Sequence, residues 1–87
     1  MNWKGYSFVI RSGVRLKVLK ALEQPKIPSQ IAKSMKYDVS TISKHLKALE
    51  EKSIAKCLTP NVKKGKIYGL TKLGIEILKT YKKTEDT

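Results

Sequence analysis

Hydroxyl and ammonium side chains recur along residues 39–52 at spacings that suit contact with a large anionic partner. They are Ser40, Thr41, Ser43, Lys44 and Lys47. Groups of this kind donate hydrogen bonds to base edges and to phosphate oxygens. At about 100° per residue, Ser40, Lys44 and Lys47 share one face of a helix, opposite an apolar face. The segment therefore predicts recognition of nucleic acid, and a solvated amphipathic helix with ordinary surface lysines is the alternative.

A second group of lysines lies in the turn-forming run PNVKKGK over residues 60–66. Proline and Asn favour a turn, and Gly65 adopts a positive φ at little cost. No Asp or Glu occurs from Ser53 to Gly74. We expect a basic loop here that contacts phosphate or the minor groove through Lys63, Lys64 and Lys66. The alternative is a hairpin edge that its lysines protect from aggregation.

The sequence offers little for catalysis or metal binding. Cys57 and His45 are the only residues of their types, and a zinc site needs three or four ligands. No Ser/His/Asp or Cys/His set stands at a recognisable spacing, and no Gly-rich phosphate loop occurs. We therefore expect no enzyme, no cofactor and no metal site, with Cys57 as a small buried hydrophobe and Asp38 as a helix cap.

The charge balance points to an anionic partner. Nineteen Lys and Arg face seven Asp and Glu, which gives a net charge of +12. Small soluble domains usually carry a net charge of about 2 to 8, so solubility alone is the weaker explanation, and nucleic acid or an anionic membrane surface is the stronger one. No run approaches the roughly 20 apolar residues of a membrane span, and no signal peptide is recognisable. The expected location is the cytoplasm.

The 87 residues suit one domain over 1–87, mainly helical with a small β-hairpin. Apolar periodicity predicts helices over 12–23, 28–36, 39–52 and 72–83, and a hairpin over 54–70. Trp3 to Ile10 has strand propensity, but we interpret it as a helical turn leading into the first helix. Ser12, Asp38 and Thr71 are the expected N-caps. Val39, Ile42, Leu46 and Leu49 form the expected buried stripe of the third helix.

Two helices joined by the short segment Lys36–Asp38, followed by a hairpin, have the order of a winged helix-turn-helix. In that motif the second helix enters the major groove while the first crosses the DNA backbone. The fold expected is a three-helix core plus a wing and a C-terminal helix.

The runs SQIAK from Ser29, VSTISKHLKALEEK from Val39 and LTPNVKKGKIYGLTKLG from Leu58 resemble the archaeal winged-helix regulators of the ArsR/MarR type. The resemblance covers roughly residues 12–80 and implies DNA binding, commonly as a homodimer on a palindromic operator. It implies major-groove contacts by Ser40, Thr41, Ser43, Lys44 and Lys47, and wing contacts by Lys63, Lys64 and Lys66. Ser29 and Gln30, on the helix that crosses the backbone, complete the candidate DNA-binding set.

Two positions depart from the family pattern. Ile27 stands where such proteins often have a Ser or Thr cap, and Ser53 stands where they often have Gly. Each departure costs about 1 kcal/mol.

The main hypothesis is a double-stranded DNA-binding transcriptional regulator. The alternatives are a protein-interaction module of the transcription machinery and a nonspecific chromatin-type DNA binder.

Overall fold

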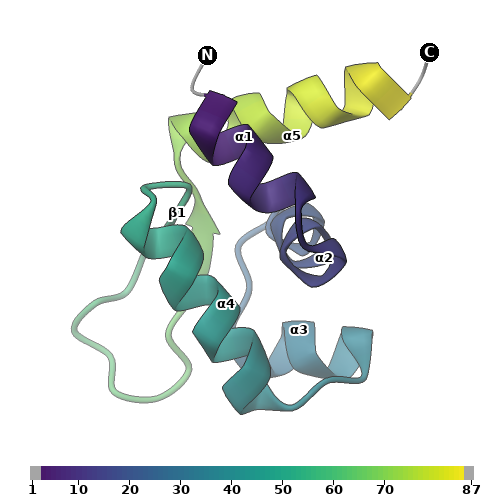
Figure 1. The fold of residues 1–87 in the computed structure, drawn as a ribbon. Coiled ribbons are helices and arrows are strands. Elements are labelled where there is room, and N and C mark those ends of the chain that lie inside the picture. The colour runs from purple at the N-terminus through teal and green to yellow at the C-terminus, as the bar shows by residue number, and fades with distance from the viewer. Residues whose placement is uncertain (1–2, 86–87) are drawn as a thin grey trace.

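The computed structural model describes residues 3–85, which form five helices and a two-stranded antiparallel sheet. The elements are α1 (Trp3–Ile10), α2 (Gly13–Ala21), α3 (Pro28–Met35), α4 (Val39–Glu51), β1 (Ala55–Cys57), β2 (Tyr68–Leu70) and α5 (Lys72–Glu85). Figure 1 shows α1 against α5 at one end of the molecule, and α3 beside the start of α4 at the other. The expected class, mainly helical with one hairpin, is confirmed.

Local chemistry sets the ends of the helices. The Ser12 hydroxyl accepts a hydrogen bond from the Arg15 amide at 3.3 Å, and the Thr71 hydroxyl accepts one from the Gly74 amide at 3.1 Å. Both are the predicted N-caps. Asp38 occupies the N-cap position of α4, but its side chain makes no cap hydrogen bond, so the predicted cap is wrong in this detail. The backbone carbonyl of Asp38 still accepts the first helical bond, from Ile42.

The turn between α3 and α4 closes α3 with a Schellman motif. The Tyr37 amide donates to the Ala32 carbonyl at 2.9 Å, and Lys36 adopts a left-handed φ of 60°. This is the bonding that ends a helix and reverses the chain in a few residues. The short connection therefore fixes α4 against α3, as a helix-turn-helix requires.

A second Schellman motif ends α4. The Ile54 amide donates to the Leu49 carbonyl at 2.9 Å, and Ser53 adopts a φ of 61°. Ile54 and Leu49 are both fully buried, which supplies the apolar contact that accompanies the motif. Ser53 thus occupies a position that favours glycine.

We expect Ser53→Gly to stabilise the protein by about 1 kcal/mol, because glycine avoids the Cβ penalty of the left-handed conformation. For a domain of this size, that gain raises the thermal midpoint by roughly 4–8 °C. Circular dichroism melts measure the shift. Ser53→Ala is the matched control, because it removes the hydroxyl and keeps the Cβ. An equal gain in both variants would contradict the backbone explanation.

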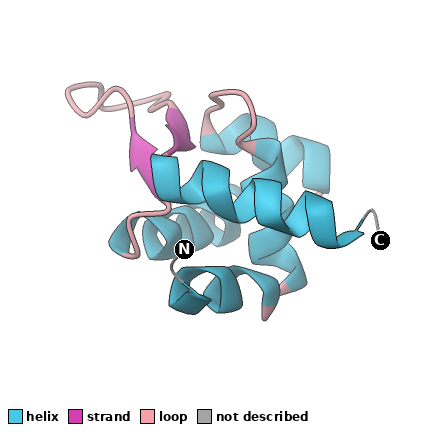
Figure 2. Ribbon diagram, turned by 90° about the horizontal axis from the view of Figure 1, so that it is seen from above, coloured by secondary structure: helices cyan, strands magenta, loops and turns pink. Residues whose placement is uncertain are grey.

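The wing (residues 54–70) is held at both ends. Ala55 pairs with Leu70 and Cys57 with Tyr68 in the sheet, and the Ile67 amide donates to the Thr59 hydroxyl at 2.9 Å. Gly65 has the predicted positive φ, 69°. Figure 2 shows the loop of the wing extending beyond the helices.

A third segment joins this sheet from before α3. Lys26 and Tyr68 exchange backbone hydrogen bonds of 3.0 and 2.8 Å as an isolated antiparallel bridge. The Lys26 ammonium also donates to the Ala21 carbonyl at 2.7 Å, at the end of α2. The bridge fixes the start of α3 beside the wing.

The core lies where α2, α4 and α5 meet. Its fully buried side chains include Val18, Leu19, Ile31, Ile42, Leu46, Leu49, Ile54 and Ile77. Glu23, just after α2, pairs with Lys82 of α5.

Three further expectations from the sequence are corrected. Cys57, expected to be a buried hydrophobe, is only half-buried. Residues Trp3–Ile10 form a full helix rather than a leading turn. Burial of Gly5 and Val9, which are four residues apart on one face, stabilises this helix against the domain, and its remaining residues are partly or largely exposed. Val39 is 48% exposed instead of buried. It stands in the first turn of α4, beyond the edge of the apolar core.

Candidate nucleic-acid interface

A groove of about 290 Å³ lies between the start of α3, α4 and the wing; we call it the wing groove. Its lining residues are Ile27, Pro28, Ser29, Val39, Ser43, Lys47, Lys63, Gly65, Lys66 and Tyr68. Five of the ten candidate DNA-binding residues are therefore brought together here: Ser29, Ser43, Lys47, Lys63 and Lys66.

Three elements place these side chains. Ser43 and Lys47 are four residues apart on α4, so they lie one turn apart on the same flank of the helix. The bridge between Lys26 and Tyr68 brings Ser29, at the start of α3, to the base of the wing. The turn at Gly65 directs Lys63 and Lys66 to the same groove.

The other five candidates lie outside the groove. Ser40 and Lys44 are exposed on α4 and, at about 100° per residue, share a face with Lys47. Lys64 is exposed on the loop of the wing.

Thr41 and Gln30 are placed less favourably for a duplex. Thr41 is half-buried, and two residues of helix separate it by about 200° from Ser43, which puts it on the opposite flank. The Gln30 side chain accepts a hydrogen bond from the Ile27 amide at 3.2 Å. That bond serves the uncapped start of α3, where Ile27 offers no side-chain cap.

Sequence reasoning missed the apolar part of the groove. Val39 was assigned to the core, and Ile27 and Pro28 were considered only as parts of a helix start. Tyr68 belongs to the predicted hairpin, but its sequence position does not mark it as part of a groove. No local signal marks these residues, because their place in the groove depends on the pairing of the segment before α3 with the wing.

The groove is electropositive. Three of its ten lining residues are lysines, and none of the ten is acidic. An apolar wall beside hydroxyls and ammonium groups offers contacts both to thymine methyl groups and to phosphates.

Tyr68 carries the phenol of this groove. Burial raises the pKa of Tyr68 above its ordinary value of 10.0, and the negative charges of Glu50 and Cys57 raise it further. The phenol therefore remains a neutral hydrogen-bond donor throughout the physiological range.

This shift predicts a loss of stability in alkali. In the unfolded chain Tyr68 loses its proton near pH 10, whereas the folded chain holds it to higher pH. The contribution is thus fully present below pH 10 and is lost as pH rises through the raised pKa of the folded state. We expect Tyr68→Phe to remove the phenolate absorbance that appears latest in a spectrophotometric titration of the folded protein. An unchanged late absorbance would show that another tyrosine carries the shift.

A possible metal site and a membrane-spanning helix are both absent from residues 3–85. Within that range no three His, Cys, Asp or Glu side chains gather into a possible metal site. None of the helices described is long and apolar enough to span a bilayer.

The two Schellman turns, the α3–α4 pair and the basic hairpin define the class of the protein: a winged helix-turn-helix domain. A family model described as a bacterial regulatory protein of the arsR family matches residues 12–56, which is more than half of the chain. The chain belongs to this family. The archaeal origin implied by the resemblance stays an expectation.

Solved structures of regulators share this fold. The homodimeric winged helix-turn-helix DNA-binding domain from Mycobacterium bovis, a possible ArsR-family regulator, superposes with a TM-score of 0.73 at 17% identity, covering 94% of this chain and 73% of that one. The S. aureus MepR–DNA complex gives a TM-score of 0.79 at 20% identity, covering 95% and 71%. MarR from E. coli gives 0.73 at 24% identity, covering 86% and 58%.

The chain spans only 54% of the transcriptional regulator SlyA and 58% of E. coli MarR. Among curated proteins, none matches the chain.

Proposed function

We propose that this protein is a transcriptional regulator that binds double-stranded DNA and acts by occupying it rather than by catalysis. The observation that carries the proposal is the wing groove, in which Ser43 and Lys47 of α4 meet Lys63 and Lys66 of the wing. A major groove about 12 Å wide admits one helix with its side chains. Ser40, Lys44 and Lys47 of α4 enter it, while the wing lysines contact the backbone or the minor groove.

The contacts divide by chemistry. Lys44, Lys47, Lys63, Lys64 and Lys66 bind phosphates and supply most of the affinity. Ser40 and Ser43, near the start of α4, reach base edges, and Val39 offers an apolar surface to a thymine methyl group. Ser29, at the start of α3, contacts the backbone where that helix crosses it.

We further propose that the protein works as a homodimer on a palindromic operator, as the Mycobacterium bovis domain is described as homodimeric. Two copies of α4 then read half-sites about one helical turn apart. In a cell without a nucleus the DNA lies in the cytoplasm, so we propose that the protein works there. Sedimentation of the protein with and without duplex measures the number of protomers bound.

The deciding experiment is a selection of bound duplexes from a random DNA pool, followed by fluorescence anisotropy. We expect one enriched palindrome that binds more than about a thousandfold tighter than random duplex at physiological salt. A preference below about tenfold would leave a nonspecific chromatin-type binder. Absence of duplex binding at low salt, together with capture of an acidic protein, would favour an interaction module.

A further inference from the structure

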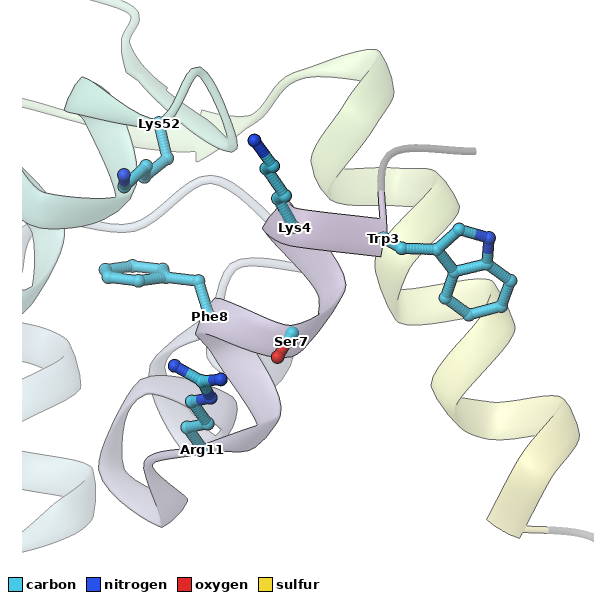
Figure 3. A pocket seen from close by; sticks show the side chains of 6 residues that line it. All are labelled: Trp3, Lys4, Ser7, Phe8, Arg11 and Lys52. Atoms are coloured by element: carbon cyan, nitrogen blue, oxygen red, sulfur yellow. The ribbon is translucent and has the colours of Figure 1, made fainter.

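A second cationic cleft, of about 370 Å³, lies between α1 and the C-terminal end of α4; we call it the α1 cleft. It is lined by Trp3, Lys4, Ser7, Phe8, Arg11 and Lys52, so three of its six residues are cationic and none of the six is acidic. In Figure 3 the Phe8 ring lies between the side chains of Lys52 and Arg11, while Trp3 points away from them toward α5.

The α1 cleft is separate from the wing groove. The two cavities share no lining residue. Lys52 follows Ser43 by nine residues, which at about 100° per residue places it on the opposite flank of α4. A ligand in one cavity therefore does not occupy the other.

Like charges are crowded around the Phe8 ring. The Arg15 guanidinium carbon lies 4.0 Å from the ring centroid, and the Lys52 ammonium lies 5.5 Å from it. The ring attracts each cation through its quadrupole, but the cations repel one another. Among the residues that the structure describes, the buried Nε of Arg15 has no hydrogen-bond partner. Cations from α2 and from the end of α4 thus meet around a side chain of α1.

Helix dipoles account for only part of this charge. Arg11 directly follows α1 and Lys52 directly follows α4, so each complements the negative end of a helix. Lys4 stands in the first turn of α1, which holds no acidic residue. A cation is unfavourable at that positive end. Helix dipoles therefore do not account for Lys4, one of the three cations that line the cleft.

We propose that the α1 cleft binds a phosphate-type oxyanion. Lys4 and Lys52 supply point charges, and the Arg11 guanidinium offers its planar set of donors, which matches two phosphate oxygens at once. The Ser7 hydroxyl adds a neutral donor. The phosphate comes either from a small phosphorylated ligand or from the backbone of a duplex. The proposal does not depend on the wing groove.

The test compares two variants of equal charge. Lys4→Gln, Arg11→Gln and Lys52→Gln together neutralise the cleft. Lys17→Gln, Lys79→Gln and Lys83→Gln together remove the same charge from exposed positions of α2 and α5. Calorimetric titration of the intact protein with sodium pyrophosphate at constant ionic strength forms one arm. Duplex affinity as a function of salt forms the other. Arg11→Gln alone serves as a second cleft variant whose thermal midpoint is compared with wild type.

We expect pyrophosphate to bind saturably and to raise the thermal midpoint. The cleft variant should bind it at least tenfold more weakly than the control variant, with duplex affinity equal in both; this result assigns the phosphate to a small ligand. If both variants bind pyrophosphate with equal affinity, and only the cleft variant loses duplex affinity and salt dependence, the phosphate is that of DNA. Equal behaviour of both variants in both arms would overturn the proposal. If the proposed DNA-binding role of the wing groove is wrong, variants of Lys47 will instead retain the duplex affinity of the wild type.

Discussion

Replacing Lys47, Lys63 and Lys66 together by alanine should weaken duplex binding by roughly two to three orders of magnitude per protomer at about 0.1 M salt. All three line the wing groove. Each lysine that neutralises a phosphate releases about 0.9 of a condensed cation, which at this salt concentration is worth a little under one order of magnitude in affinity. The slope of log affinity against log salt should fall by about 2.7 for each protomer.

The slope of log affinity against log salt tests the proposed phosphate contacts more sharply than the affinity at one salt concentration does. Random and operator duplexes should lose affinity equally, since phosphate contacts carry no sequence information. The matched control replaces Lys17, Lys79 and Lys83 by alanine, which removes the same charge from α2 and α5. A similar loss of slope in the control would mean that net charge, rather than the groove, attracts the duplex. Lys44→Ala alone should lower the slope by about 0.9.

Gly74→Ala should destabilise the fold by about 3 kcal/mol or more, because there is no room for the added methyl group. A Cβ at this position would lie 2.2 Å from the carbonyl oxygen of Ile54. That oxygen also accepts hydrogen bonds from the Thr71 amide at 3.1 Å and from the Thr71 hydroxyl at 3.0 Å. To make space, the start of α5 would have to move away from the wing and break these bonds. For a domain of this size, the thermal midpoint should fall by roughly 12–24 °C.

Gly13→Ala is the control for this variant. Gly13 opens α2, and a Cβ there would meet nothing within 4 Å. Alanine is also the better helix former by up to about 1 kcal/mol, so this variant should melt at or slightly above the wild-type temperature. A Gly74→Ala protein that melts with wild type would show that α5 does not approach the wing closely.

The helices were predictable because their signals are local. The apolar period of residues 39–52 predicted α4, and three of the four positions that it marked as buried are buried: Ile42, Leu46 and Leu49. The caps at Ser12 and Thr71 were correct for the same reason, since each bonds an amide three residues away. The prediction that Val39 is buried was wrong. The burial of a side chain in the first turn of α4 depends on which distant parts of the chain pack over it.

The site was only partly predictable. The lysines of α4 and the wing were chosen by charge and spacing, and Lys47, Lys63 and Lys66 do line one groove. Two of the candidates conflict with local geometry that the choice by residue type ignored: the helical period puts Thr41 on the opposite flank from Ser43, and Gln30 stands three residues after Ile27, where its side chain bonds the Ile27 amide. The α1 cleft was not predicted at all, because Arg11 and Lys52 are 41 positions apart in the sequence.

The sequence by itself determined helices α2 to α5, the turn residues and the excess of positive charge, since hydrophobic periodicity, capping and ionisation depend on near neighbours. Tertiary structure alone decided that Lys26 pairs with Tyr68, that Gly74 touches Ile54, and that two separate cationic cavities form on opposite flanks of α4. These contacts join residues far apart in the chain. Their geometry is set by how the packed core closes, which no short stretch of sequence specifies.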